Sequence, residues 1–298
     1  PLGLRYAIAI IFPIVGTFFV AFSILEDSGY LPRLAMLIDR LFKRIGLNGR
    51  AVIPLVLGFG CGTMATMVTR TLESRRERII ATFLLALAIP CSAQMGVILG
   101  LLSRYPRALL LWCAFLVAVF AIAGFLAARV MPGRGPSFYM ELPPLRLPKL
   151  SNVAAKTVSR MTWYFKEVLP LFILASVLIW LGQITGIFQF LIRCITPIVT
   201  FMGLPPDAAR IFLFGFFRRD YGAAGLYDLT QAGLLTSAQL TGAAVALTLF
   251  LPCVAQFLIM AKERGMKVSL AIAGITFALA IAGGYLVNLL ITLIGGHL

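Results

Sequence analysis

One short pattern occurs twice in this sequence, each time inside a long apolar segment. Residues 83–102 read FLLALAIPCSAQMGVILGLL and residues 245–261 read VALTLFLPCVAQFLIMA, so Pro-Cys-x-Ala-Gln stands at residues 90–94 and again at 252–256. Proline lacks a backbone donor and frees the carbonyl oxygen one turn earlier, which breaks a helix. Such breaks persist within a membrane only where protein or a wet cavity covers the backbone. The pattern therefore predicts an all-α membrane protein with broken helices at matching places in two repeats.

Further landmarks support an internal duplication. They are proline and glycine positions 157 residues apart, namely Pro13 and Pro170, Gly46-Leu47 and Gly203-Leu204, and Gly58-Phe59 and Gly215-Phe216. The two Pro-Cys patterns are 162 residues apart, which implies five extra residues (162 − 157) in the second half, and we expect them in the loop 228–238. We therefore expect a first repeat over 1–130, a basic, proline-rich linker over 131–162 and a second repeat over 163–298.

The composition excludes a soluble globular domain. Of the 298 residues, 60% are hydrophobic and 12% are charged, whereas soluble domains carry about 25% charge. The net charge of +15 would indicate nucleic acid in a soluble protein. Here the basic residues gather at the edges of apolar segments and in the linker, within 33–50, 70–78, 129–166 and 262–267. The charge thus indicates membrane orientation and contact with lipid headgroups, with no role in binding nucleic acid.

Long apolar segments predict a polytopic protein with about eight transmembrane helices, since a span needs about 20 residues. Six segments are uninterrupted in this sense: 6–25, 79–103, 108–130, 164–184, 239–261 and 268–295. Two more, near 51–68 and 208–227, are interrupted by glycine-containing breaks. Segment 31–45 has one apolar face and several basic residues, which favours a helix lying in the interface. Whether the repeats are parallel or inverted stays open.

The two Pro-Cys breaks are candidate metal positions. Each places a thiol, Cys91 or Cys253, three residues before an amide, Gln94 or Gln256, and therefore on the same helix face. Thiolates, amide oxygens and freed carbonyls suit a borderline divalent metal better than Mg²⁺ or Ca²⁺. The alternative is that each Cys is a small packing residue and each Pro a kink.

A third cysteine, Cys61, lies in the glycine-rich break Gly58-Phe59-Gly60-Cys61-Gly62. It would complete a thiolate-rich site, or else Gly58 and Gly62 serve helix packing. The remaining cysteines, Cys113 and Cys194, have no polar companion and are interpreted as packing residues.

Acidic residues near or within apolar segments are candidates for attracting cations. Glu26 and Asp27 close the first expected span, and Asp220 lies inside an apolar segment beside Arg218 and Arg219. Ionisable groups within a membrane are costly and usually line a pathway or pair with each other. For Glu26 and Asp27 the alternative is exposure to water, and for Asp220 it is a local pair with Arg219.

Several activities are excluded by missing motifs. The only histidine is His297, so a histidine-rich zinc site has no ligands, and no GxxxxGK[ST] loop is present to hold nucleotide phosphates. No nucleophile and base stand at a spacing that suits an enzyme. The opening Pro1-Leu2-Gly3-Leu4 is typical of a segment cut from a longer protein.

With these motifs in view, the chain resembles the membrane part of the bacterial ferrous iron transporter family FeoB, which has two gate regions. The first half carries the resemblance in Pro13–Phe19, Leu25–Arg33, Gly58–Cys61 with Thr69–Thr71, Pro90–Ala93 and Glu141–Pro148. The second half carries it in Lys166-Glu167, Ser176–Trp180 and Pro252-Cys253. Two places depart from the family pattern: Gly62-Thr63-Met64 replaces Asn-Val-Pro, and Arg219-Asp220 replaces Lys-Glu. Met64 is itself a soft ligand.

The resemblance implies transport of Fe²⁺ across the bacterial inner membrane by a multi-pass protein. Fe²⁺ is then the substrate and this chain holds no nucleotide site. The implied partners are a GTPase domain or chain on the cytoplasmic side, a small accessory Feo protein, membrane lipid and a second copy of the chain. Two alternatives stay open: a transporter of a nucleoside or another small organic solute, and a membrane scaffold that anchors a GTPase.

Overall fold

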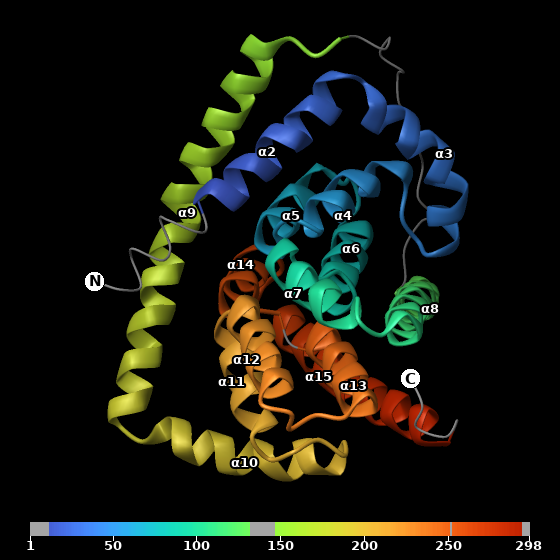
Figure 1. Cartoon of the computed structure of the whole chain (residues 1–298). Coiled ribbons are helices and arrows are strands. Elements are labelled where there is room, and N and C mark those ends of the chain that lie inside the picture. The colour runs from blue at the N-terminus through green and yellow to red at the C-terminus, as the bar shows by residue number, and fades with distance from the viewer. Residues whose placement is uncertain (1–11, 132–146, 251, 294–298) are drawn as a thin grey trace.

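A computed structural model describes residues 12–131, 147–250 and 252–293, and these residues form helices with no strand. The helices fall into two series in chain order (Figure 1). The first series is α2 (Phe12–Asp27), α3 (Tyr30–Arg44), α4 (Val52–Gly58), α5 (Gly62–Val68), α6 (Arg75–Leu87), α7 (Ser92–Leu102) and α8 (Pro106–Val130). The second is α9 (Leu150–Ile184), α10 (Ile187–Phe201), α11 (Ala208–Phe217), α12 (Arg219–Gln231), α13 (Ser237–Leu249), α14 (Val254–Arg264) and α15 (Met266–Leu293). Two 3₁₀ turns, η2 (Gly49–Ala51) and η3 (Thr69–Thr71), flank α4 and α5.

The expected duplication is confirmed by the ends of these helices. Both ends of α3 and α10 are 157 residues apart, and α6 with α7 matches α13 with α14 at 162 residues. Gly29 and Gly186 precede α3 and α10 with φ of 76° and 73°, a left-handed conformation that favours glycine. The five extra residues lie between Arg219 and Ser237 and lengthen α12, so the loop expected over 228–238 is confined to 232–236.

Four helical segments are long and apolar enough to cross a membrane. They are Arg75–Leu102, Pro106–Val130, Ser237–Arg264 and Met266–Leu293, and a pair bent by 89°, Ser176–Gly182 with Ile187–Phe201, would make a fifth. The expected count of about eight spans is therefore not confirmed in the described part of the chain. The segments near 51–68 and 208–227 are pairs of short helices, because each is broken at its glycine-containing stretch.

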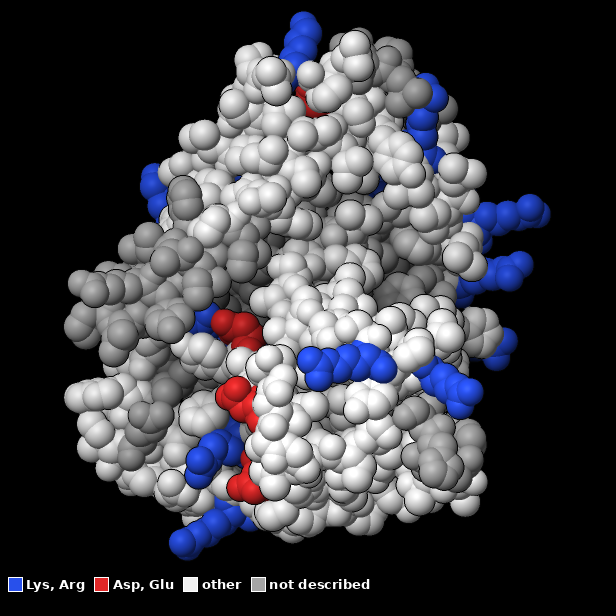
Figure 2. Space-filling view, in the orientation of Figure 1, with Lys and Arg blue, Asp and Glu red and all other residues white. Residues whose placement is uncertain are grey.

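Helix α9 begins inside the stretch expected to be a linker. The helix includes residues 150–162 of that stretch. Residues 132–146, which hold most of the motif Glu141–Pro148, lie outside the described residues. The same is true of the first part of the expected span 6–25 and the last residues of 268–295. Figure 1 shows α9 apart from the central helices, with α2 against it. Broad uncharged areas separate the Lys and Arg side chains on the face drawn in Figure 2, as expected of a membrane protein.

The core lies where the two series meet. An apolar stretch of 18 residues within Ser237–Arg264 is 82% buried inside the protein. The corresponding stretch of Pro106–Val130 is 17% buried, so that helix faces outward. Helix α13 packs closely on α15 because both carry small residues: a Cβ placed on Gly242 would lie 3.4 Å from the backbone oxygen of Gly284. The broken helices α6–α7 and α13–α14 are thus held inside the protein.

Candidate metal pathway at the helix breaks

Four helix breaks lie in the interior of the molecule, two in each repeat. They separate α4 from α5, α6 from α7, α11 from α12, and α13 from α14. The residue directly before the second half-helix is Cys61, Cys91, Arg218 and Cys253 respectively, and none of these side chains makes a capping hydrogen bond to the helix that follows. All three cysteines singled out in the sequence therefore occupy the same kind of position, directly before the second half-helix.

Hydrogen bonds join the two breaks of the first repeat to each other and to the second repeat. The backbone N–H and the hydroxyl of Ser92 both donate to the oxygen of Gly60, at 3.3 and 3.1 Å. The amide Nε2 of Gln94 donates to the backbone oxygen of Leu247 at 3.0 Å, which connects α7 to the end of α13. Segments far apart in sequence are thereby held at one place.

Arg219 completes the break between α6 and α7. Its Nη1 donates to the oxygen of Ile89 and its Nη2 to the oxygen of Ala86, both at 3.1 Å. The oxygen of Ala86 would normally accept from the residue four positions later, but that residue is Pro90, which has no N–H. The guanidinium supplies the missing donors from the other repeat, and its residue is only 6% exposed.

Both glutamines predicted as ligands are buried beside the breaks. Gln94 and Gln256 are 0% and 1% exposed, and each keeps one polar side-chain atom without a hydrogen bond, Oε1 of Gln94 and Nε2 of Gln256. Gln256 lies against Gly62, where an added Cβ would come within 2.8 Å of its Oε1. Of these two atoms, Oε1 of Gln94 is an acceptor that can also coordinate a cation, whereas Nε2 of Gln256 is a hydrogen-bond donor.

The three cysteines of the breaks differ in exposure from the other two. Each is partly buried, whereas Cys113 and Cys194 are exposed on the outside. Met64 is buried with Phe19 and Met67, and Cys61 packs against the same cluster. Among the described residues, no three His, Cys, Asp or Glu side chains are arranged to hold a metal ion together.

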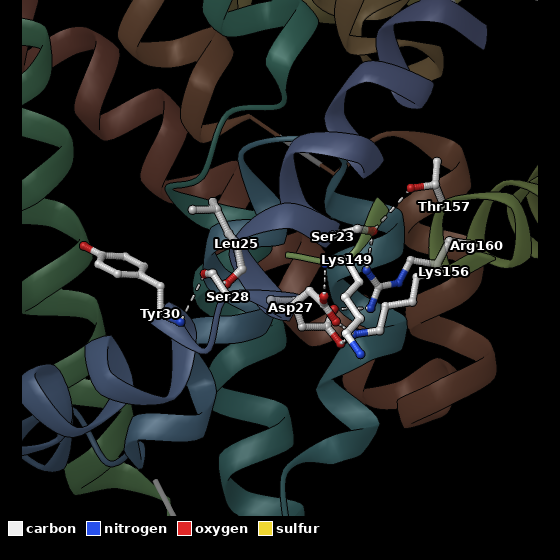
Figure 3. A network of polar contacts seen from close by, with 10 residues as sticks. Ser23, Leu25, Asp27, Ser28, Tyr30, Lys149, Lys156, Thr157 and Arg160 are labelled. Atoms are coloured by element: carbon white, nitrogen blue, oxygen red, sulfur yellow. Dashed lines mark hydrogen bonds and ion pairs between the residues drawn. The ribbon is translucent and has the colours of Figure 1, made fainter. Parts of the chain in front are cut away.

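Glu26 and Asp27 contact α9 and not the breaks. Lys156 pairs with both carboxylates, at 3.5 and 3.4 Å, and Arg160 pairs with Glu26. Asp27 also accepts the backbone N–H of Lys149 at 3.0 Å (Figure 3). That hydrogen bond, aided by Lys156, lowers the pKa of Asp27 below its ordinary value. These two residues therefore stand apart from the cysteines and glutamines.

Asp220 pairs with Arg218, so the expected pair with Arg219 is wrong. Nε and Nη2 of Arg218 donate to the Asp220 carboxylate at 3.1 and 2.6 Å, and the guanidinium also lies over the ring of Tyr221. The side chain of the next residue, Arg219, points toward the first repeat instead. Sequence reasoning missed this role, although Pro90 signals an oxygen without a donor and the repeat places Arg219 opposite Gly62 (219 − 157).

Comparison with known proteins covers nearly the whole chain. The Gate family, described as "Nucleoside recognition", matches residues 8–105 and 165–267, and the family "Ferrous iron transport protein B C terminus" matches residues 109–160. Proteins named Fe(2+) transporter FeoB are similar to it: that of Methanocaldococcus jannaschii is 29% identical over 98% of this chain and 48% of its own length. The one from Synechocystis is 30% identical over 72% and 37%, respectively. The chain thus spans about half the length of these relatives or less. No solved structure matches it.

Proposed function

The chain belongs to the FeoB family, and on that premise we propose that it forms the membrane pathway of a ferrous iron transporter. The observation that carries the proposal is the meeting of four helix breaks, three of which carry a cysteine directly before the following helix, beside the buried Gln94, whose amide oxygen has no hydrogen-bond donor. Sulfur, amide oxygen and free carbonyl oxygen together suit Fe²⁺ better than the hard cations Mg²⁺ and Ca²⁺. In this proposal Cys61, Cys91 and Cys253 are the soft ligands.

Transport requires weak and sequential contacts. An ion must enter and leave, so a closed cage of several thiolates would hold it too firmly. We therefore assign transient coordination to Gln94, Gln256 and the carbonyl oxygens of the breaks, with Met64 as a further soft contact next to Cys61. We assign Glu26, Asp27 and Asp220 the electrostatic attraction of the cation. We do not assign them as ligands, since each carboxylate is paired with Lys or Arg.

The energy source and partners lie outside this chain in the proposal. We place GTP hydrolysis in a cytoplasmic GTPase domain or chain, and we assign no enzymatic step to the residues of this chain. A relative in Porphyromonas gingivalis is named as a fusion of Fe(2+) transport protein A with FeoB, which supports a small accessory Feo protein as a partner. We further propose a location in the bacterial inner membrane, where lipid and a second copy of the chain would surround the outer helices.

The test is Fe²⁺ entry into sealed vesicles. The chain is reconstituted without oxygen, Fe²⁺ is added outside, and a dye inside reports entry. We expect wild-type vesicles to fill faster than protein-free vesicles. The pair Cys91→Ser and Cys253→Ser should lower the rate to that of protein-free vesicles, because both breaks lose their thiol. The matched pair Cys113→Ser and Cys194→Ser removes two exposed thiols and should leave the rate unchanged.

Two results would contradict the proposal: equal entry in wild-type and protein-free vesicles, or a wild-type rate after Cys91→Ser with Cys253→Ser. The same vesicles test a nucleoside as substrate, an alternative favoured by the description of the Gate family as "Nucleoside recognition". If the vesicles take up a labelled nucleoside and show no entry of Fe²⁺, the transported substrate is the nucleoside and not iron.

A further inference from the structure

The charge of Arg219 is buried without a carboxylate partner. Within the described part of the chain, no Asp or Glu lies within ion-pair distance of its guanidinium, whose two hydrogen bonds both go to backbone oxygens. Its Nε is buried with no hydrogen bond at all. A buried charge without a counter-ion is costly, and in a membrane protein such a residue points to a functional role.

The fold does not require an arginine at this position. The equivalent residue of the first repeat is Gly62, which begins α5 as Arg219 begins α12. That repeat has the same break, yet no cation reaches from Gly62 to the oxygens at the end of α13. The two backbone oxygens need hydrogen-bond donors and not a positive charge, so their satisfaction alone does not explain why the donor at this position is a buried cation.

The two oxygens that hold Arg219 form a position for a cation. They lie at the end of α6, where the helix dipole is negative, and Pro90 leaves the oxygen of Ala86 without its usual donor. Broken helices in transporters coordinate cations with such oxygens. Cys91, a proposed iron ligand, stands two residues after Ile89, whose backbone oxygen accepts the hydrogen bond from Arg219.

We propose that the guanidinium of Arg219 is a tethered cation that fills this position and closes the pathway until the transported ion displaces it. Fe²⁺ and a guanidinium cannot occupy neighbouring sites cheaply, because like charges repel strongly where water is excluded. Fe²⁺ reaching Cys91 therefore drives the side chain off the oxygens of Ala86 and Ile89, and these oxygens become free to receive the ion. The proposal rests on the pathway described above and assigns its regulation.

The experiment compares Fe²⁺ entry in vesicles containing Arg219→Ala with wild type. We expect entry to rise by about tenfold or more, because removing a like charge from the path lowers the barrier. Millimolar guanidinium ion should bring the rate back toward wild type, since it fits the vacated space and donates to both oxygens, whereas urea at equal concentration, which has a similar planar shape but no charge, should not. Arg210→Ala, which removes an exposed arginine of α11, should show neither effect.

Two further variants keep the test decisive if Arg219→Ala does not assemble. Arg219→Gln loses the charge and should raise the rate, while Arg219→Lys keeps the charge and should remain near wild type. Equal rates for these two, or a raised rate in Arg219→Ala that ignores guanidinium, would overturn the proposal. If wild-type and variant vesicles all admit no Fe²⁺, it is the transport pathway itself that has failed.

Discussion

Gln94 in the first repeat donates a hydrogen bond to the backbone oxygen of Leu247 in the second. Arg219 in the second repeat does the converse and donates to Ala86 and Ile89 in the first. Each half therefore supplies side-chain donors to a broken helix of the other half. Because neither break is complete by itself, the two repeats form one structural unit, and the site exists only where they meet.

Gln94→Ala should destabilise the protein by about 1–3 kcal/mol, because the buried oxygen of Leu247 loses its donor. Thermal unfolding in detergent measures the effect. The control Gln189→Ala changes an exposed glutamine of α10 and should leave the unfolding temperature within error. Equal unfolding temperatures for the two variants would show that the bond to Leu247 contributes nothing.

Gly62→Ala should slow Fe²⁺ entry into vesicles severalfold. The added methyl group would lie 2.8 Å from Oε1 of Gln256, so this proposed ligand has to move away. Gly96→Ala is the matched control, since a methyl group there meets no atom within 4 Å. An unchanged rate in Gly62→Ala would remove Gln256 from the pathway.

Glu263→Gln should destabilise the protein by about 1 kcal/mol. Glu263 on α14 accepts two hydrogen bonds from Arg70, which follows α5, so the pair links the two repeats. The side chain of Glu263 is only 9% exposed. Glu73→Gln breaks a pair with Arg50 inside one repeat, where the carboxylate is 56% exposed, and should cost less. Thermal unfolding of both variants checks this order, and a larger loss in Glu73→Gln would reverse our assignment.

Lowering the pH should weaken the contact between α2 and α9. The folded-state pKa of Asp27 is depressed, so its contribution is present at neutral pH and is lost as the pH falls through that value, below about pH 4. Asp27→Asn should therefore lose less stability than wild type between pH 5 and pH 3, as measured by thermal unfolding at each pH (roughly the acid range of a carboxylate). Asp207→Asn, at an exposed residue before α11, should behave as wild type does. Identical curves for Asp27→Asn and wild type would contradict the role of this carboxylate.

The duplication and the positions of the breaks were predictable because proline and glycine act locally. Pro90 and Pro252 lack a donor wherever they stand, so the ends of α6 and α13 follow from the sequence. The start of α9 at Leu150 was not predictable, since prolines and basic residues before it indicate a linker. The expected number of spans is not confirmed in the described residues, because apolar content does not distinguish one long helix from two short ones.

The candidate site was predictable in its residue types and not in its contacts. Cys91, Gln94 and their counterparts follow from the repeated pattern, yet the partner of Asp220 depends on which way two adjacent arginines turn. Arg218 precedes α12 and pairs with Asp220, whereas Arg219, the first residue of α12, reaches α6. Such contacts between elements more than 100 residues apart depend on tertiary packing, which a local pattern does not encode.

The deep burial of α13 and α14 bears on how the protein is made. A broken helix with unpaired backbone groups is poorly accepted by lipid, and 82% of this segment's apolar window is covered by other helices. During synthesis the segment emerges after α6 and α8 but before α15. Because α13 packs most extensively on α15, which follows it in the chain, the broken segment is fully covered only after α15 has joined it.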